Sequence, residues 1–342
     1  MAIHVGWDSF PSHPPRSTRV TWGVYDGIHL GHQAVLHGLS AWARESGAES
    51  VVLTFDPHPQ AFLRQVEIPL VMPVAERVRL IARCGIDTVI VIPFDGPFSE
   101  LSPERFYVDL LKGRLGAGGI LIGYDARFGH RGSGAGPELR ALAAPDGIPV
   151  RSSDPCLLDG RPVKSSRLRE AIARGDLAGA RAMMRRPVCL VGPVVTGDRR
   201  GRQLGFPTAN LDCRGLVLPP SGVYAIRGWE RPRGGGAVGD EEAGPFPGAM
   251  YIGSRPTFGP SGRAVVEVHF IGFPPDRDLY GATLRIELVR QLRGDMAFAH
   301  AGALKARIAE DCAQALETLR DGSPTGPAAD CAASTEPPAA RP

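Results

Sequence analysis

The sequence predicts an α/β protein with two domains, a parallel sheet in the first and a small antiparallel β-barrel in the second. From residue 20 to about 150, short apolar runs alternate with helical patterns, which is typical of parallel β-α-β units. After about residue 184, short runs are separated by Gly and Pro turns, as in a small barrel. The length of 342 residues also suits two domains better than one. We expect the domains to cover residues 1–184 and 185–320, with the boundary near 184–188.

The first domain is expected to contain four strands that lead into helices. The strands cover residues 19–22, 50–55, 87–93 and 118–123, and the helices cover residues 33–44, 74–83 and 103–115. Ser102 is expected to cap the last of these helices, with Pro103 at its first position. A further helix should start at Ser165 and Ser166 and run through Leu177. Ligands of such sheets bind at the carboxyl ends of the strands, so residues that follow the strands are candidates for a site.

The second domain is expected to contain short strands and one terminal helix. The strands cover residues 190–195, 223–227, 250–252, 264–271 and 283–289, and the helix covers residues 297–320. Residues 228–248 are rich in Gly, Pro and Glu and are expected to form a long, mobile hairpin loop. Residues 321–342 have low complexity, which predicts a disordered tail.

Composition argues against several classes of protein. With 43% apolar and 22% charged residues the chain can form real cores. The net charge of +3 is weak and no basic cluster is present, so we expect no nucleic-acid partner. Six cysteines without C-x-x-C spacing indicate neither a zinc site nor a disulfide framework. We expect no signal peptide, no membrane span and a cytoplasmic location, and a weak homo-oligomer stays open.

The first motif lies between a predicted strand and a predicted helix, at residues 23–32. His29 and His32 are three positions apart and are separated by Gly31. Backbone N–H groups and the helix dipole favour anions there, glycine lets a ligand approach closely, and imidazoles can donate to phosphate oxygens. The pattern H-x-G-H resembles the signature of nucleotidyltransferases. Two other readings stay open for the pair alone: a turn with two surface histidines, or two ligands of a metal site.

A second motif follows about 130 residues later. Ser165 and Ser166 put two hydroxyls at a helix start, with Arg167 and Arg169 close behind. Hydroxyls, free N–H groups and guanidinium groups together suit a triphosphate chain. The alternative is ordinary N-capping with solvated arginines. Because this motif follows H-x-G-H at the spacing expected of a nucleotidyltransferase, we favour phosphate binding.

Two further segments, residues 54–59 and 123–129, follow predicted strands and therefore lie at the same edge of the sheet. Phe55 and Phe128 could sandwich a planar ring, and either could equally be a core residue.

Taken in order, G-x-(F/Y)-D-G-x-H-x-G-H, T-F-x-P-H-P, R-F-G and the S-S motif resemble the FAD synthetase module of bacterial bifunctional riboflavin kinase/FAD synthetases. The resemblance implies a Rossmann-like nucleotidyltransferase domain that transfers AMP from ATP to FMN with Mg²⁺, giving FAD and pyrophosphate. It implies His29 and His32 as catalytic residues, and ATP or phosphate contacts from Gly23, Asp26, Gly31, Ser165, Ser166 and Arg169. It implies flavin contacts from Phe55, Pro57, His58, Asp125, Arg127 and Phe128. Because the phosphate of FMN is already an anion, positioning and charge neutralisation should carry this reaction.

Three positions depart from this family. Ala126 stands where an aromatic residue is usual, Lys164 where serine is common, and Ala135 where an acidic residue often follows the Gly-rich loop. Since the phosphate motifs are intact, the sequence predicts ATP binding more firmly than a preference for a particular flavin.

The second domain carries a separate candidate site at residues 205–210. Thr208 and Asn210 offer neutral oxygens spaced two apart, which suit Mg²⁺. The preceding loop, residues 197–203, is rich in Gly and Arg but lacks the G-K-(S/T) of a Walker A motif. Taken alone, the segment is equally typical of a proline-initiated turn with local capping.

Residues 265–270 alternate with period two, so that Val266, Val268 and Phe270 face one way and Glu267 the other. A carboxylate on such a strand is either a salt-bridged residue at a barrel mouth or a general base, and the period does not decide between them.

The ordered motifs G-F-P-T-A-N, G-V-Y, I-G-x-R-P-T-F, V-E-V-H and D-L-Y-G resemble the riboflavin kinase module, with Tyr251 where asparagine commonly stands. The resemblance implies that Glu267 accepts the proton of the riboflavin 5′-hydroxyl, and that Thr208 and Asn210 hold Mg·ATP. It implies nucleotide contacts from Gly205 and Pro207, and phosphate or flavin contacts from Arg255 and Arg293.

The sequence thus predicts conversion of riboflavin to FMN and then to FAD. Two rival hypotheses stay open. One is a kinase whose first domain is degenerate or specialised for a flavin analogue, given Ala126 and Ala135. The other is a flavin-sensing binding protein without turnover, against which the intact Glu267, Thr208 and Asn210 argue.

Overall fold

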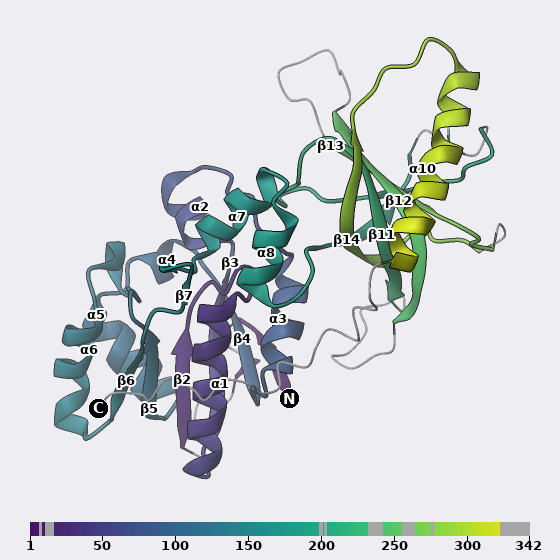
Figure 1. Cartoon of the computed structure of the whole chain (residues 1–342). Helices are drawn as coiled ribbons and strands as arrows, with labels where there is room; N and C mark the ends of the chain where they lie inside the picture. The colour runs from purple at the N-terminus through teal and green to yellow at the C-terminus, as the bar shows by residue number, and fades with distance from the viewer. Residues whose placement is uncertain are drawn as a thin grey trace. The chain divides into compact units, whose positions relative to one another are not determined.

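The computed structural model describes residues 1–6, 9–10, 17–197, 201, 204–231, 242–254, 264–274 and 277–321 (Figure 1). Its contacts divide the chain into two compact units. Among the described residues, the first unit holds residues 1–68 and 74–165, and the second holds residues 69–73 and 166–321. The domain boundary near residues 184–188 stays a prediction. Most of the loop 197–203, Arg255 and the tail 322–342 lie outside the described residues.

The first unit is built on a six-stranded parallel sheet with the order β1-β4-β3-β2-β5-β6. Its strands are β1 (Ala2–Val5), β2 (Thr18–Trp22), β3 (Glu49–Asp56), β4 (Thr88–Pro93), β5 (Ala117–Gly123) and β6 (Val150–Ser153). The four predicted strands are confirmed within one residue at either end, whereas β1 and β6 were not predicted. The chain runs outward from β2 in both directions, through β3 on one side and β5 on the other. The switch point of this doubly wound sheet therefore lies at the carboxyl ends of β2 and β5.

Helices cover both faces of the sheet. On one face, Gly38 of α1 (Leu30–Glu45) lies against Leu121 of β5. On the other, residues that alternate along the strands, such as Val20 and Leu53, form one core with the helical segment 103–114 and α6 (Gly136–Ala143). α3 (Val74–Arg83) has the predicted bounds. The shorter elements are α2 (Pro59–Arg64), α4 (Gly96–Ser99), η3 (His130–Gly132), η4 (Ala144–Asp146), β7 (Leu157–Leu158) and β8 (Arg161–Pro162).

Two predicted helices differ from the structure. Ser102 caps the expected helix, since its side chain accepts from the Arg105 N–H, but only α5 (Pro103–Arg105) is α-helical and η2 (Phe106–Arg114) is a π-helix. The expected single helix through Leu177 is wrong: α7 (Ser165–Ala173) ends before Gly175, whose φ is +79°. Asp176 then caps α8 (Leu177–Met184) by accepting from the Gly179 N–H at 2.8 Å.

The second unit contains a closed antiparallel barrel with the order β10-β13-β12-β11-β14-β9. Its strands are β9 (Cys189–Val195), β10 (Ala209–Leu211), β11 (Gly222–Arg231), β12 (Ala243–Ser254), β13 (Ala264–Phe270) and β14 (Thr283–Gly294). The predicted barrel and terminal helix are confirmed. The loop expected at residues 228–248 is partly wrong, because β11 continues to Arg231 and β12 begins at Ala243. Both strands pair along this stretch as a hairpin.

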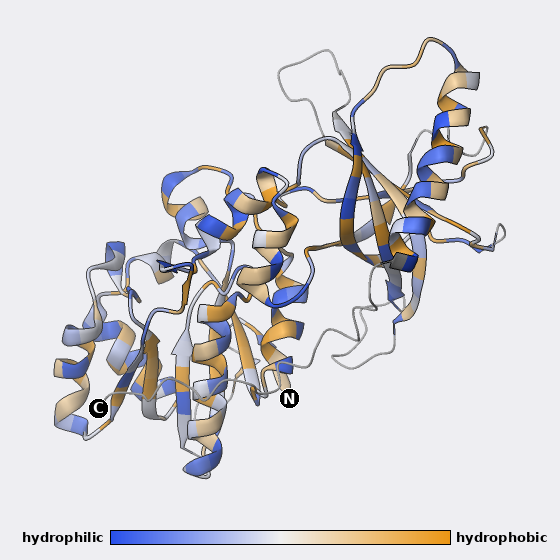
Figure 2. Cartoon of the chain, in the orientation of Figure 1, coloured by the Kyte–Doolittle hydropathy of each residue, from blue (hydrophilic) through white to orange (hydrophobic). Residues whose placement is uncertain are grey.

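The terminal helix α10 (Ala301–Asp321) starts four residues later than predicted and packs on the outside of the barrel. Its hydrophobic and hydrophilic residues interleave along its length (Figure 2). Cys312 and Ala315 form a buried cluster with Val223, Ala225 and Ala249 of the barrel. In the part of the chain that the structure describes, no helix is long and apolar enough to cross a membrane.

Candidate functional site

The H-x-G-H motif forms the N-terminus of α1. His29 is the N-cap, and its Nδ1 accepts from the His32 backbone N–H at 3.4 Å. The two imidazole rings are stacked, with centroids 3.6 Å apart and an interplanar angle of 19°. His29 is buried, at 5% exposure, and His32 meets the Tyr25 ring edge to face at 5.2 Å. The predicted helix N-terminus is confirmed, and both histidines lie within its first turn rather than on an open surface.

The loop before these histidines has an unusual backbone. Tyr25 and Ile28 have φ values of +53° and +36°, which L-residues rarely adopt, and Gly27 has a φ of +86°. The buried Tyr25 hydroxyl is 2.9 Å from the Thr21 hydroxyl and holds this turn against β2. The N–H of Gly23 donates to the Leu53 carbonyl of β3 at 3.0 Å. Contacts with β2 and β3 therefore hold this turn at the switch point of the sheet. Strained backbone that its neighbours hold in place is typical of functional sites.

The structure brings the second motif against the first. The Ser165 hydroxyl donates to the Asp26 carbonyl at 2.8 Å, although the two residues are 139 positions apart. A Cβ on Gly31 would lie 3.3 Å from the His29 ring and 3.7 Å from the Val163 carbonyl. A larger residue at position 31 would therefore press on the His29 ring. Ser166 and Arg169 follow on the same helix, α7.

The ends of β3 and β5 hold the remaining predicted residues of this site. After β3, the Asp56–Pro57 peptide is cis, and His58 caps α2 by accepting from the Gln60 N–H at 3.1 Å. The Phe55 ring packs on Phe94 and Phe98.

After β5, the Phe128 ring packs on Trp22 and Phe106. Both Phe55 and Phe128 are thus members of a buried aromatic core, which was one of the two readings of these residues.

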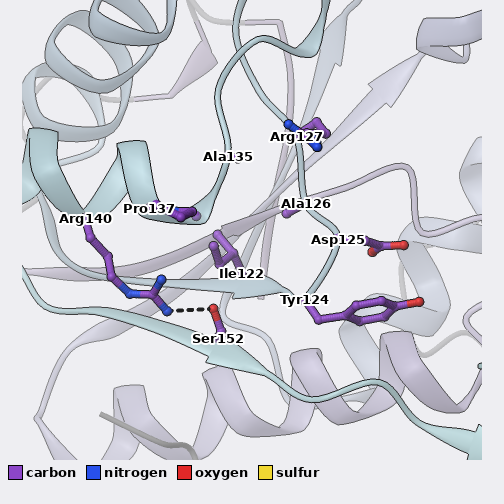
Figure 3. Close-up of a pocket in the computed structure, with 10 residues that line it drawn as sticks. Ile122, Tyr124, Asp125, Ala126, Arg127, Ala135, Pro137, Arg140 and Ser152 are labelled. Atoms are coloured by element: carbon purple, nitrogen blue, oxygen red, sulfur yellow. Dashed lines mark hydrogen bonds between the residues drawn. The ribbon is translucent and has the colours of Figure 1, made fainter.

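Ala126 and Ala135, the two alanines that depart from the family, line one cavity of about 340 Å³ at the carboxyl ends of β5 and β6 (Figure 3). Its other lining residues are Ile122, Tyr124, Asp125, Arg127, Gly136, Pro137, Arg140 and Ser152. Asp125 forms an ion pair with Lys164 at 2.9 Å, and the Lys164 ammonium lies 5.4 Å from the Tyr124 ring. The hydrogen bond that the Lys164 ammonium donates to the Asp125 carboxylate raises the pKa of Lys164. Arg140 donates to the Ser152 hydroxyl at 3.0 Å. All three departures therefore occur in and around one cavity.

In the barrel, the register of the strands places the kinase candidates together. Glu267 on β13 pairs directly with Asn210 on β10 and with Tyr251 on β12. The predicted alternation is confirmed, because Val266 and Val268 are buried inside the barrel while Glu267 is half-buried on the outer face. Burial raises the pKa of Tyr251, and the carboxylates of Asp295 and Glu267 add to the effect.

The segment 205–210 is fixed to β13 beside Glu267. The Pro207 carbonyl lies 2.8 Å from Nδ1 of His269, and the Phe206 ring meets the His269 ring edge to face at 5.5 Å. Gly205 has a φ of +88°. A Cβ on Gly201 would lie 3.0 Å from the Thr208 hydroxyl, so this glycine of the preceding loop leaves room beside the hydroxyl.

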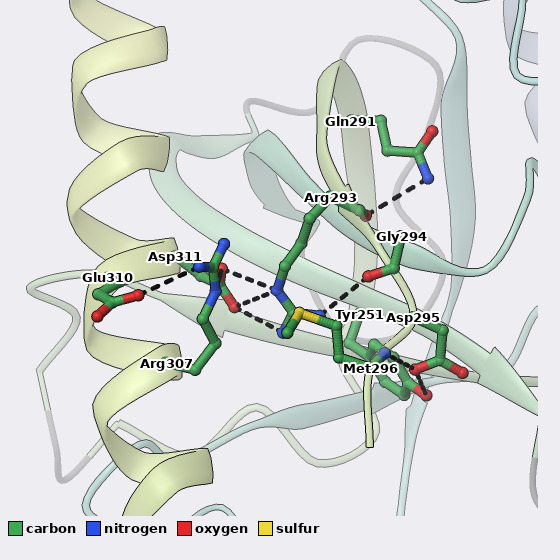
Figure 4. Close-up of polar contacts among 9 residues, drawn as sticks. All are labelled: Tyr251, Gln291, Arg293, Gly294, Asp295, Met296, Arg307, Glu310 and Asp311. Atoms are coloured by element: carbon green, nitrogen blue, oxygen red, sulfur yellow. Dashed lines mark hydrogen bonds and ion pairs between the residues drawn. The ribbon is translucent and has the colours of Figure 1, made fainter. Parts of the chain in front are cut away.

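Arg293 is held by an acidic partner that the sequence reading missed. Its Nη2 is 2.8 Å and its Nε 3.0 Å from the carboxylate of Asp311 on α10, which also binds Arg307 (Figure 4). Nearby, the Tyr251 hydroxyl donates to Asp295 at 3.1 Å (Figure 4). Asp311 carries no signal in the sequence, since a lone aspartate in an amphipathic helix predicts a solvated face.

Comparisons with known proteins match both units. A family model described as FAD synthetase matches residues 12–167, and one described as riboflavin kinase matches residues 184–319. The bifunctional riboflavin kinase/FMN adenylyltransferase of Escherichia coli (strain K12) is 33% identical over 312 residues, covering 91% of this chain and 96% of the relative. That of Bacillus subtilis (strain 168) is 30% identical over 305 residues, covering 86% and 90%. A solved structure described as a macrolide-efflux protein from Streptococcus pneumoniae has 25% identity and a TM-score of 0.77, covering 94% of this chain and all of that one.

Proposed function

This chain belongs to the family of bifunctional riboflavin kinase/FMN adenylyltransferases, and from that premise we propose how its residues carry out the two reactions. One activity phosphorylates riboflavin to FMN, and the other transfers AMP from ATP to FMN to give FAD. The two family models and these relatives support both activities and favour neither a flavin-binding protein without turnover nor a kinase with an inactive first unit. Because both reactions consume ATP, we assign the enzyme to the cytoplasm.

For the adenylyl transfer, the single observation that carries the proposal is the hydrogen bond between Ser165 and Asp26, because it joins the two phosphate motifs. His29 and His32 neutralise charge on the α-phosphate and the leaving pyrophosphate during transfer. The FMN phosphate attacks the α-phosphorus, the bond to pyrophosphate breaks, and no general base is needed. Gly23, Asp26 and Gly31 shape the turn that approaches the nucleotide. Ser166 and Arg169 are further phosphate ligands.

We propose that the flavin of the adenylyl site contacts the cavity lined by Ala126 and Ala135. Tyr124 offers a ring face, and Asp125 and Arg127 offer polar groups at its rim. Pro57 and His58, at the end of β3, are further contacts. Phe55 and Phe128 support this region from the aromatic core.

For the kinase, Glu267 accepts the proton of the riboflavin 5′-hydroxyl as that oxygen bonds to the γ-phosphorus and ADP leaves. Thr208 and Asn210 fit Mg²⁺, because their oxygens are neutral and hard and the Gly201 backbone leaves space beside the Thr208 hydroxyl. When bound, the ion would neutralise charge on the phosphates. Gly205 and Pro207 contact the nucleotide, and Arg293 borders the flavin.

One assay tests both halves. Purified protein is incubated with ATP and Mg²⁺ and with either riboflavin or FMN, and the flavins are separated by chromatography. We expect FMN and then FAD from riboflavin, and FAD with pyrophosphate from FMN. FMN without any FAD would refute the adenylyltransferase assignment despite the family match, and no product from either flavin would refute both.

A further inference from the structure

Arg77 is a fully buried cation that neither motif contains. It lies on α3 at 0% exposure, next to the carboxyl end of β3. Its Nη1 donates to the Thr54 hydroxyl at 3.1 Å and to the Phe55 carbonyl at 2.9 Å. Its Nε and Nη2 are buried and make no hydrogen bond with the described residues. Burying a guanidinium group with two nitrogen donors that make no hydrogen bond costs free energy of folding. A buried arginine at this position therefore suggests a functional role.

The negative charges near Arg77 are carboxylates of residues that border the adenylyltransferase site. Burial lowers the pKa of Arg77, and the carboxylates of Asp26 and Asp56 oppose that effect. Asp26, at 1% exposure, belongs to the turn before the histidines, and Asp56 ends β3. The turn before the histidines and the end of β3 therefore supply negative charge that opposes the cost of burying this cation.

Thr54 connects Arg77 to the same turn. Its hydroxyl accepts from Arg77 and donates to the Val24 carbonyl at 3.1 Å. Two residues further, the Asp26 carbonyl accepts from Ser165. A chain of contacts thus runs from α3 through β3 to the turn at residues 23–28, and from that turn to the second phosphate motif.

We propose that Arg77 is a positioning residue of the adenylyltransferase site, which fixes the turn before His29 through Thr54 and Asp26. The inference rests on the proposed function of that site. Arg77 touches no substrate. It holds a strained turn in the one geometry that places the two imidazoles at the phosphates, and displacements of about 1 Å in such a site cost about 10²-fold in rate.

The test compares Arg77→Met and Arg77→Lys with Arg79→Met, which removes another buried arginine from the same helix. We measure kcat and KM for FAD formation, the riboflavin kinase rate of the same sample, and the unfolding temperature. We expect Arg77→Met to lower kcat by about 10²-fold, with the KM for ATP and FMN and the kinase rate little changed. Arg77→Lys, which keeps the charge, should recover part of kcat, and Arg79→Met should keep it.

If Arg77→Met does not fold, Thr54→Val provides a second test of the same inference. It removes the hydroxyl that links Arg77 to Val24 while keeping the shape, and it should lower kcat in the same way. Combined with Arg77→Lys, the two losses should not add, because both act on one chain of contacts. Unchanged kcat in Arg77→Met, or in Thr54→Val, overturns the inference while wild-type FAD synthesis stands. Absence of FAD from the wild type would instead refute the proposed function.

Discussion

Asn210 on β10 and Glu267 on β13 are directly opposite one another in the antiparallel register of the barrel. Side chains in such a pair have Cβ atoms about 4.5–5.5 Å apart on the same face of the sheet. The amide that is proposed to hold Mg·ATP and the carboxylate that is proposed to accept the hydroxyl proton are therefore neighbours on one face. This adjacency is what an in-line transfer requires, because nucleophile and phosphate must meet between them.

Glu267→Gln should abolish most kinase activity and leave the second reaction intact. The amide keeps the shape of the carboxylate but cannot accept the proton, and loss of a general base costs about 10²–10⁴ in rate. Riboflavin phosphorylation should fall by that factor, while added FMN is still converted to FAD. Near-normal FMN formation in this variant would contradict the role of Glu267.

Thr208→Ala and Asn210→Ala should weaken the use of Mg·ATP in the kinase reaction alone. Each removes one neutral oxygen from the proposed ion site, so more Mg²⁺ should be needed for half-maximal riboflavin phosphorylation. The Mg²⁺ dependence of FAD formation from FMN serves as the control, because that reaction uses a separate ATP. Equal losses in both reactions would indicate misfolding or a shared nucleotide site.

His29→Ala and His32→Ala should each depress FAD formation by about 10²–10³, the scale of losing one donor to developing charge. Their rings are stacked 3.6 Å apart, so removal of one also frees the other to move. The double variant should therefore lose less than the product of the two single effects. Ser102→Ala, which removes another helix-capping side chain of the same unit, separates these losses from loss of a cap, and the kinase rate reports folding. A change below threefold in either single variant would argue against direct charge stabilisation.

The sequence predicted β3 to β5 well because strands buried on both faces are nearly continuous apolar runs. It did not predict β6, because an edge strand that reads Val-Arg-Ser-Ser carries no such run. It read the start of β12 as a loop because Gly244, Pro245 and Pro247 break the strand pattern, although the ladder with β11 continues through them. An apolar pattern in a sequence reflects burial, and the residues of β6 are only half-buried while residues 243–245 of β12 are exposed.

For the candidate site, the sequence motifs identified the residues, whereas their interaction partners are visible only in the structure. Ser165 and Asp26 are in contact across 139 positions, which no local pattern encodes. The flavin contact of Arg293 stays a prediction from resemblance, and the structure adds that its guanidinium is paired with Asp311, whose side chain is 3% exposed. The Asp311 partner depends on how α10 docks on the barrel, and docking is a property of the whole fold.

Ala126→Phe should fill part of the cavity that Ala126 and Ala135 share. If the flavin binds at this cavity, an added ring that stacks on it should tighten FMN by up to about 1 kcal/mol. Ala126→Leu adds bulk without an aromatic face and is the matched control. The KM and Kd for FMN decide the outcome: tighter binding in both variants would indicate simple filling, and weaker binding in both would show that the open cavity itself accommodates the flavin.

Protonation of Glu242 should make the barrel less stable in acid. Its carboxylate lies 2.8 Å from Arg231 and 2.7 Å from Arg285, and the Arg285 guanidinium stacks 3.8 Å from the Trp229 ring. Burial pushes the pKa of Glu242 upward, but hydrogen bonds and charge attraction from Arg285 and Arg231 outweigh it and hold the pKa below its ordinary 4.5. A depressed pKa stabilises the fold fully above about pH 4.5, and that contribution is lost as the pH falls through the lowered value.

Glu242→Gln therefore should destabilise the barrel most at neutral pH, by about 1–3 kcal/mol, since two buried guanidinium groups lose their shared anion. We expect the temperature that halves riboflavin kinase activity to drop by several degrees at pH 7, and the gap to the wild type to narrow as the pH falls below 4.5. Glu230→Gln is the control on the same hairpin, because its partner Arg277 is 41% exposed and its pair should contribute less. A gap between Glu242→Gln and the wild type that stays constant from pH 7 to pH 4 would show that the carboxylate charge is not what holds the two arginines, and that packing around Trp229 stabilises this end of the barrel instead.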